Sequence, residues 1–274
     1  MTQIHTVTEV FDAIRVVKAG TPRLITNFFP DQNKLQTWIH CGRLVGTTAD
    51  GIAYFLRRDR DFWHFYYCAE SEQALRDGLL KVTHLQRVPV VVDVVGSEEC
   101  VLGVLDALQF AGFCQYNRLH RMTRATLRDP VPPQDNGVEA VYAGQSDVGA
   151  ILDLLCRSFD PYAKQLPLRE EIKTAVTNGQ ILIAHVGGAL AGVLFSKTQG
   201  LTSTIRYWLV DKPFLMLGIG SALMRKYLVA QCSAERLLLW VVGTNENAIR
   251  KYQHYGFVPD GLVDHILVNK FIRL

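Results

Sequence analysis

Hydrophobic residues in the first half of the chain recur at two spacings, one typical of helices and one of strands. Val10, Ile14 and Val17 share one helical face, and Gly20 is expected to end this helix. Ser71 is predicted to cap a later helix, because its hydroxyl can accept a hydrogen bond from the first helical turn. The patterns predict helices over 10–20, 33–41, 71–86 and 100–110, and strands over 52–57, 62–68, 88–95 and 113–123, with a hairpin turn at 58–61.

A stretch without hydrophobic periodicity separates the two halves. Residues 127–137 read LRDPVPPQDNG, with three prolines and one glycine. Proline fixes φ and removes a backbone donor, so this stretch is predicted to be extended and unpaired. We therefore expect a first domain over 1–126, a linker over 127–137 and a second domain over 138–274.

The second half has a clearer pattern. Its first helix is amphipathic, with Val148, Ile151, Leu154 and Leu155 on one face. The sequence predicts strands over 138–142, 180–186, 188–196, 203–211, 237–242 and 263–272, and helices over 147–159, 170–176, 218–232 and 245–255. This order is typical of an α/β fold with a mixed central β-sheet flanked by helices.

Composition excludes several classes of protein. The chain has 274 residues, 49% of them hydrophobic, and a net charge of +3, which is too small to predict binding to nucleic acid or to a membrane. No apolar run approaches the ~18 residues that span a bilayer, and the N-terminus lacks a secretory pattern, so we expect a cytoplasmic protein. The six cysteines form no CxxC pair, which argues against a disulfide framework or a metal site.

The segment YWLVDKPFLMLGIGSALMRKYL predicts a strand, a loop and a helix that opens at Gly218-Ile219-Gly220. Free N–H groups and the positive dipole end at a helix start can bind phosphate oxygens. A Walker A loop is excluded because no Lys follows Gly220, and a dinucleotide fingerprint is excluded because position 223 is Leu. An ordinary strand-to-helix turn remains the alternative.

A second motif, NENAIRKYQHYGF, follows about 25 residues later. Ala248 and Tyr252 are four residues apart and share one helix face, and Gly256 lies where a left-handed residue would end the helix. Tyr252 could equally be a core aromatic with its hydroxyl at the surface.

Together the two motifs resemble those of the GNAT acyltransferase superfamily. The match is Val210 … Gly218-x-Gly220 … Leu223, then Asn245-x-x-Ala248-x-x-x-Tyr252-x-x-x-Gly256-Phe257. The order of elements over 138–274 fits as well. The resemblance implies a GNAT fold for this half and acetyl-CoA, or another acyl-CoA, as the cofactor.

The resemblance also implies roles for individual residues. The CoA pyrophosphate would lie on the backbone of Leu217, Gly218, Ile219, Gly220 and Ser221. The strand at Leu209 and Val210 would diverge from its neighbour and pair with the pantetheine arm, and the Val210 N–H would polarise the thioester carbonyl. Asn245 and Ala248 would contact the cofactor. Tyr252 would protonate the departing thiolate as general acid.

Two departures from the family pattern concern charge. Leu215 and Leu217 stand where the family usually has Gln or Arg and a second basic residue, so charge-assisted phosphate contacts are lost unless Lys212, Arg225 or Lys226 compensates. The apolar run 214–217 would serve as core packing or receive a longer acyl chain. The predicted strand face with Thr202, Thr204, Arg206 and Trp208 holds no carboxylate, so the general base is unassigned, with Asp160 or water as candidates.

The acceptor site is expected near the loop over 159–164, which usually forms one wall of the amine site in this family. Asp160 and Tyr162 are the candidate substrate contacts there. Arg206 would pair with a substrate carboxylate, or else form a cross-strand salt bridge or be a solvated edge residue.

The first half is interpreted as a degenerate copy of the same plan. Its late elements follow the same order, but the position of the phosphate loop reads Ala69-Glu70-Ser71-Glu72-Gln73, whose acids would repel a pyrophosphate. An unrelated α/β domain is the alternative. The fold class predicted for the whole chain is therefore α/β, with two tandem GNAT-like domains.

The function predicted from the sequence is N-acyl transfer, in which a primary amine of a small molecule attacks acetyl-CoA directly in a ternary complex. Two alternatives stay open: a non-catalytic acyl-CoA-binding regulatory protein, and an acyltransferase that uses a carrier-protein-bound or longer acyl donor. We expect no nucleic-acid or membrane partner, and we leave open whether the chain forms a homodimer.

Overall fold

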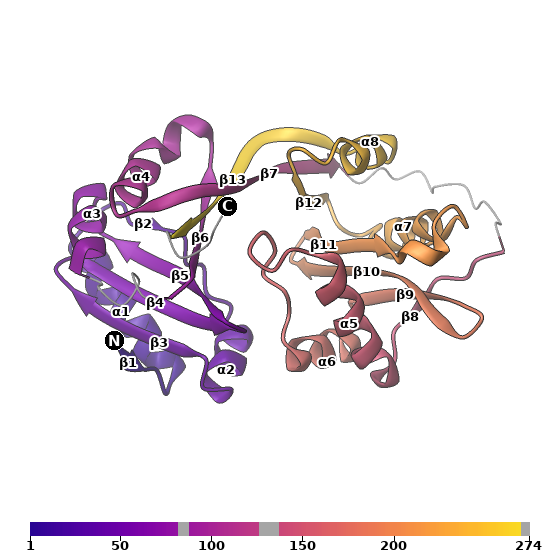
Figure 1. Ribbon diagram of the computed structural model, residues 1–274, viewed down its shortest axis with the longest axis horizontal. Helices are drawn as coiled ribbons and strands as arrows, with labels where there is room; N and C mark the ends of the chain where they lie inside the picture. The colour runs from indigo at the N-terminus through magenta and orange to yellow at the C-terminus, as the bar shows by residue number, and fades with distance from the viewer. Residues whose placement is uncertain (82–87, 126–136, 270–274) are drawn as a thin grey trace. The chain divides into compact units, whose positions relative to one another are not determined.

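The computed structural model describes residues 1–81, 88–125 and 137–269, which fall into two compact units (Figure 1). Unit 1 comprises Met1–Leu119 and Gly261–Leu274, and unit 2 comprises His120–Asp260. The chain passes between the units along β7 (Phe113–Ala125) and β13 (Val258–Asn269), since each unit boundary falls within one of these strands. Most of the predicted linker, the end of the predicted helix over 71–86 and the end of the last predicted strand lie outside the described residues.

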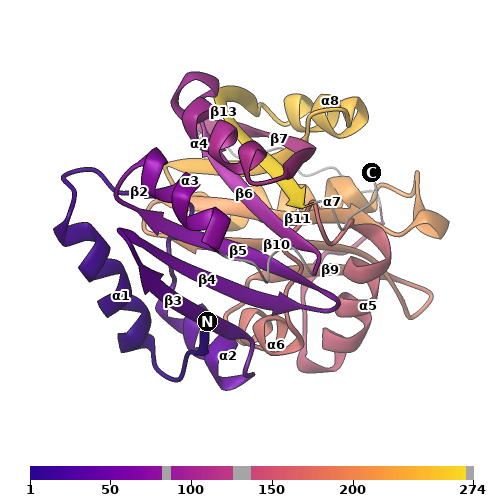
Figure 2. The same ribbon diagram turned by 60° about the vertical axis from the view of Figure 1, so that its left-hand side comes forward.

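Unit 1 is built on a mixed sheet whose strands follow the order β1-β3-β4-β5-β6-β13-β7, and β3 to β6 lie side by side in Figure 2. The pairs from β3 to β5 are antiparallel, whereas β5 and β6 run parallel. Its strands are β1 (Thr2–Gln3), β2 (Ile25–Thr26), β3 (Leu44–Ala49), β4 (Ile52–Asp59), β5 (Phe62–Ala69) and β6 (Val90–Gly96), and its helices are α1 (Val7–Ala19), α2 (Gln32–His40), α3 (Glu72–Lys81) and α4 (Glu98–Phe110).

The two faces of this sheet carry different residues, as the alternation of side chains along a strand requires. Tyr54 and Phe65 belong to a core cluster with α3 and α4. Their neighbours on the other face include Arg57 and Tyr66, both of which contact Trp38 of α2. The predicted hairpin is confirmed, and the Ser71 hydroxyl accepts a 3.0 Å hydrogen bond from Ala74 N–H as predicted. The sequence reading missed β3 and the two-residue strands β1 and β2.

Unit 2 has a second mixed sheet with the order β7-β12-β11-β10-β9-β8. Neighbouring strands from β8 to β11 are antiparallel, and β11 and β12 are parallel. The strands are β8 (Val141–Tyr142), β9 (Ile181–Val186), β10 (Ala189–Gln199), β11 (Thr202–Val210) and β12 (Arg236–Val242). The helices are α5 (Val148–Ser158), α6 (Arg169–Thr177), α7 (Ile219–Ala230) and α8 (Glu246–His254), with short 3-10 turns η2 (Gln145–Asp147) and η3 (Lys212–Phe214).

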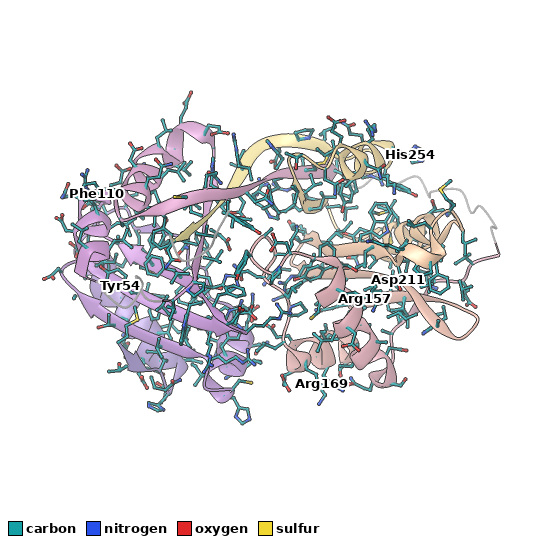
Figure 3. All side chains as sticks on the ribbon, in the orientation of Figure 1. Tyr54, Phe110, Arg157, Arg169, Asp211 and His254 are labelled. Atoms are coloured by element: carbon teal, nitrogen blue, oxygen red, sulfur yellow. The ribbon has the colours of Figure 1, made fainter. Side chains whose placement is uncertain are left out.

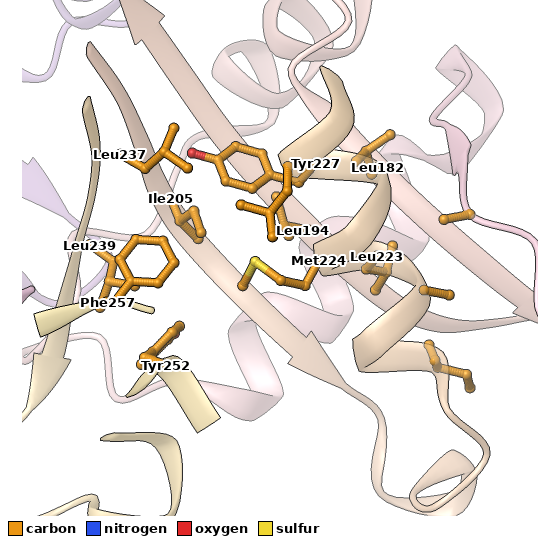
Figure 4. Close-up of a cluster of buried hydrophobic side chains, with 14 of the residues drawn as sticks. Leu182, Leu194, Ile205, Leu223, Met224, Tyr227, Leu237, Leu239, Tyr252 and Phe257 are labelled. Atoms are coloured by element: carbon orange, nitrogen blue, oxygen red, sulfur yellow. The ribbon is translucent and has the colours of Figure 1, made fainter. Parts of the chain in front are cut away.

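Helices cover both faces of this second sheet. Leu182 and Leu194 pack with α7 in one core cluster, shown in Figure 4. Ile183 and Val193, which are adjacent to those residues on the same strands, pack with α5 and α6 in a second core cluster. The predicted α/β class with mixed sheets flanked by helices is confirmed in both units. Among the residues that the structure describes, no helix is long and apolar enough to cross a membrane.

Candidate functional site

The helix α7 begins within the predicted glycine segment, at Ile219 directly after Gly218. Gly218 precedes the helix with φ of 76°, a left-handed conformation that glycine adopts without strain. The Gly218 carbonyl accepts the first helical hydrogen bond, from Ala222 N–H at 3.0 Å. The N–H groups of Ile219, Gly220 and Ser221 therefore have no carbonyl partner within the helix and point out of its positive end.

Beside this helix start, β11 and β12 diverge. Their parallel pairing covers Thr202 to Ile205 of β11 and ends at Leu239 of β12, although both strands continue. On its other edge β11 stays paired with β10 as far as Val210. The backbone edge of β11 from Arg206 to Val210 is thus not paired with β12. We call the gap along this edge the β11–β12 slot.

A β-bulge marks the point where the slot begins. Phe195 of β10 pairs with Tyr207 and the next residue, Ser196, pairs with Ile205, so β11 carries Arg206 as an extra residue. A bulge bends a strand and increases its twist, which turns β11 away from its parallel neighbour. It also reverses the side-chain alternation, because Ile205 packs with α7 whereas Tyr207 packs with α5 and α6.

The bulge therefore corrects one expectation about β11. Thr202, Thr204, Arg206 and Trp208 were expected on one face, but Trp208 packs against the α7 cluster while Arg206 contacts Phe195 and Tyr207 of the opposite cluster. The expectation fails because strict two-residue alternation does not survive an inserted residue. Trp208 and Val210 consequently share the face that carries α7.

The backbone of Val210 is directed into the slot. Asp211 N–H donates to Ala191 O of β10 at 2.9 Å. Successive N–H groups of a strand point to opposite edges, so the N–H of Val210 points away from β10 and toward β12. This is the direction that the predicted oxyanion role requires.

Trp208 connects the helix start to Tyr252. Its indole N–H donates to Gly220 O at 3.2 Å. The centroid of its ring lies 5.4 Å from that of the Tyr252 ring and 5.8 Å from that of the Tyr255 ring. A methyl group placed on Gly220 would lie 3.4 Å from both Trp208 and Val210, an ordinary van der Waals distance, so the start of α7 lies close against β11. The sequence reading did not single out Trp208.

Tyr252 lies in the α7 cluster with only 8% of its surface exposed. Burial raises its pKa well above the ordinary tyrosine value, so the hydroxyl stays protonated at neutral pH. The structure thus shows Tyr252 as a core aromatic, and its role as proton donor stays a prediction.

Asn245 and Ala248 form the N-terminal cap of α8. The Asn245 side-chain oxygen accepts a 3.0 Å hydrogen bond from Ala248 N–H. Gly256, with φ of 80°, follows the helix in the left-handed conformation that its position predicts. The contacts of Asn245 and Ala248 thus account for their spacing by helix capping, and their contact with a cofactor stays a prediction.

The loop that contains Asp160 and Tyr162 is anchored beside the slot. Asp160 accepts a hydrogen bond from Tyr162 N–H at 2.9 Å, which forms a local turn. Lys164 Nζ donates to Trp240 O of β12 at 2.9 Å, and Tyr207 Oη donates to Gln165 O at 2.6 Å. Lys164 thus binds a carbonyl of β12 just beyond the point where β12 stops pairing with β11. No signal in the sequence predicts this contact.

Among the described residues Arg206 forms no cross-strand ion pair, and its pairing with a substrate carboxylate stays a prediction. Its guanidinium donates to Gln165 O at 3.4 Å and lies 5.7 Å from the rings of Phe195 and Tyr207. In the described part of the chain no carboxylate forms a salt bridge with it. Asp211, the carboxylate that directly follows β11, is instead paired with Arg157 at 2.5 Å, as Figure 3 shows.

The apolar loop before α7 is mostly exposed. Phe214 packs against the α7 cluster, but Leu215, Met216 and Leu217 are 53%, 99% and 48% exposed. Core packing therefore explains only the first residue of the run. Met216 has φ of 68°, a strained conformation for a residue with a side chain. The loop presents apolar side chains where the resemblance led us to look for phosphate-binding bases.

Gly192 is a further residue that the sequence reading missed. A methyl group placed there would lie 2.7 Å from Ile219 Cγ2 and 3.1 Å from Leu209 O. Glycine at this position lets the start of α7 lie directly on β10, which fixes the helix start beside the slot. Glycine inside a strand pattern is the only signal that could have indicated such a close approach.

Comparison with known proteins identifies the fold. The profile of the Acetyltransferase (GNAT) family matches residues 148–257. A GCN5-related N-acetyltransferase from Kribbella flavida is similar over 94% of this chain and 95% of its own, with 15% identity and a TM-score of 0.59. A GCN5-related N-acetyltransferase from Sphaerobacter thermophilus is similar over 80% of this chain and 76% of its own, with 15% identity and a TM-score of 0.59.

A third similar structure is described as a tandem GNAT protein from the clavulanic acid biosynthesis pathway. It matches 98% of this chain and 96% of its own, with 13% identity and a TM-score of 0.58. At identities this low, the similarities show the fold alone. None of the curated proteins that were compared with the chain matches it.

Proposed function

We propose that this chain, whose residues 148–257 form an acetyltransferase domain of the GNAT family, transfers an acyl group from acyl-CoA to a primary amine of a small molecule. Acetyl-CoA is the simplest donor. One observation carries the proposal: the edge of β11 that is not paired with β12 lies beside the N–H groups at the start of α7. An extended chain with a phosphate at one end fits that combination of groups.

The residues at the slot have distinct proposed roles. The N–H groups of Ile219, Gly220 and Ser221 bind phosphate oxygens through hydrogen bonds and the helix dipole. Val210 N–H donates to the acyl oxygen as negative charge develops there, and such a donor contributes most in a site that excludes water. The thioester of the donor supplies an activated acyl carbon.

Transfer forms a C–N bond between the amine and the acyl carbon and breaks the C–S bond. Tyr252 donates its hydroxyl proton to the departing sulfur, which its raised pKa allows because the hydroxyl is protonated before the reaction. The amine must lose a proton, and the described residues near β11 place no unpaired carboxylate on the strand to accept it. We therefore assign this proton to water and propose no protein base.

A donor other than acetyl-CoA is the second candidate, and a specific observation favours it. Leu215, Met216 and Leu217 are exposed and apolar where bases would bind the phosphates of CoA. A longer acyl chain, or a carrier protein that presents its acyl group on a single phosphate, would depend less on such bases.

Thermal unfolding with different donors tests the proposal. A ligand at 100 times its Kd stabilises the folded protein by about 2.7 kcal/mol. We expect acetyl-CoA and free CoA to raise the unfolding temperature, with turnover of acetyl-CoA by an added amine. Stabilisation by long-chain acyl-CoA alone would favour the second candidate, stabilisation without turnover would favour a regulatory binding protein, and no stabilisation by any of them would refute the proposal.

A further inference from the structure

Unit 1 contains a gap between parallel strands like the one in unit 2. The pairing of β5 with β6 is limited to Trp63 with Val90 and His64 with Val91. β5 continues to Ala69 and β6 continues to Gly96. Beyond His64, the two strands are therefore not paired with each other.

The chain itself occupies this gap. β2 pairs with β5 antiparallel, with Ile25 opposite Ala69 and Thr26 opposite Cys68. Asn27 comes next and lies between the two strands. Its side-chain nitrogen donates to Phe65 O of β5 and to Asp93 O of β6, both at 3.0 Å, and its side-chain oxygen accepts from Tyr67 N–H of β5 at 2.8 Å.

These three contacts match a primary carboxamide and no other side chain of this length. A carboxamide has two N–H donors on one atom and an acceptor oxygen on another. A carboxylate would place oxygen against the two carbonyls, and a hydroxyl has only one donor. Thr26 holds the segment in place, since its hydroxyl donates to Tyr67 O at 2.7 Å and accepts from Phe28 N–H at 2.9 Å.

We propose that the gap between β5 and β6 is a carboxamide-binding site, and that Asn27 fills it as a built-in ligand. The site belongs to unit 1 alone and does not depend on the function proposed for unit 2. Asn27 also lines a cavity of about 780 Å³ together with Tyr67, Val94 and Val104. A small primary amide can therefore reach the site through this cavity once the Asn27 side chain is removed.

Chemical rescue tests the proposal on the full chain. Asn27→Gly should lower the unfolding temperature. Acetamide should then bring the unfolding temperature of the variant closer to that of wild-type protein at the same acetamide concentration. N,N-dimethylacetamide should give no rescue, because it has no N–H to donate to Phe65 O and Asp93 O. Asn33→Gly, at an exposed position of α2, is the matched control and should show no rescue by acetamide. Equal responses of the two glycine variants to acetamide would overturn the proposal.

A second variant keeps the test decisive if Asn27→Gly does not fold. Asn27→Asp retains the shape but places a carboxylate against two carbonyl oxygens, which disfavours the charged form and raises the pKa of the introduced group. The loss of stability relative to wild-type should be largest at neutral pH and should shrink as acid protonates the carboxyl. Recovery of folding on acidification supports the donor requirement, whereas a stability difference that is constant from pH 7 to pH 4 contradicts it.

Discussion

The two units contain the same pair of diverging parallel strands, and in unit 1 the chain itself fills the gap between them through Asn27. In unit 1, β4, β5, α3, β6 and α4 follow one another as β10, β11, α7, β12 and α8 do in unit 2. Asn27 bonds to both strands of the first gap, whereas β11 beyond Ile205 is not paired with β12 in the second. The same backbone arrangement can thus be a closed structural element or a binding slot, depending on one added segment.

The helix starts beside the two gaps differ as well, in the groups that they would offer to an anion. The Ser71 side chain caps α3 by accepting from Ala74 N–H, and Glu70 and Glu72 lie on either side of it. In unit 2 no side chain caps α7, which begins at Ile219 after the N-cap Gly218 and carries no acidic residue in its first turn. An anion would therefore meet satisfied donors and negative charge at α3 but free N–H groups at α7. This difference supports the interpretation of unit 1 as a degenerate copy, and the shared fold confirms the tandem arrangement.

The comparison predicts that catalytic loss follows changes in unit 2, and Tyr252→Phe should have the largest effect. Removing the proton that Tyr252 donates should lower turnover by ~10²-fold or more while donor binding persists. Steady-state kinetics and calorimetry measure the two quantities. Tyr255→Phe is the matched control, because Tyr255 also contacts Trp208 and is not assigned a proton transfer. Equal turnover in wild-type and Tyr252→Phe would remove Tyr252 from the mechanism.

A bulky residue at the start of α7 should mainly weaken donor binding. Gly220→Val places its side chain against Trp208 and Val210, where the first added carbon is already at 3.4 Å. Relieving this overpacking moves the helix start, which we expect to weaken acyl-CoA binding about tenfold, or ~1.4 kcal/mol. Gly149→Ala in α5 has open space around it and should leave affinity unchanged. Unchanged affinity in Gly220→Val, measured by calorimetry, would argue against a ligand at this helix start.

Acid should destabilise the protein through a buried charged cluster of unit 1. Arg57 and His64 contact Asp59 at 3.0 and 3.5 Å, and all three side chains are at most 5% exposed. Burial and then the charge of Arg57 lower the pKa of His64, so the folded protein holds this imidazole neutral. Asp59 also has a lowered pKa: burial opposes its ionisation, but the neighbouring His64 and the charge of Arg57 prevail.

The sign of the pH effect follows from His64. Stability is fully present above the unfolded histidine pKa of about 6.5 and falls as pH drops below it, by up to about 1.4 kcal/mol per pH unit. Asp59 adds its loss only in stronger acid, as pH falls from the unfolded aspartate pKa of about 3.9 toward its own lowered pKa. Urea unfolding between pH 8 and pH 5 should show this slope in wild-type protein and a flatter one in His64→Gln. An equal slope in both proteins would contradict the assignment to His64.

The sequence predicted the features that depend on local signals. Gly256 adopts the left-handed conformation expected at a helix end, α7 begins within the predicted glycine segment, and Ser71 caps its helix as predicted. The features it did not predict arise between distant segments. Nothing near Arg206 in the sequence signals a bulge, since the register depends on the turn between β10 and β11. Likewise, Asn27 reads as a loop residue until the fold brings it to Phe65 and Asp93.

The smallest predicted effect concerns the residue that joins the helix start to Tyr252. Trp208→Phe keeps an aromatic ring against Tyr252 but removes the 3.2 Å hydrogen bond to Gly220 O, which should cost about 0.5–1.5 kcal/mol. We expect KM for acyl-CoA to rise between two- and tenfold, by the same free energy, with a smaller change in kcat. Trp240→Phe on β12 is the matched control and should leave KM unchanged. A fall in kcat with constant KM would instead mean that Trp208 acts by orienting Tyr252. The hydrogen bond from the indole to Gly220 O would then not be needed for acyl-CoA binding at the start of α7.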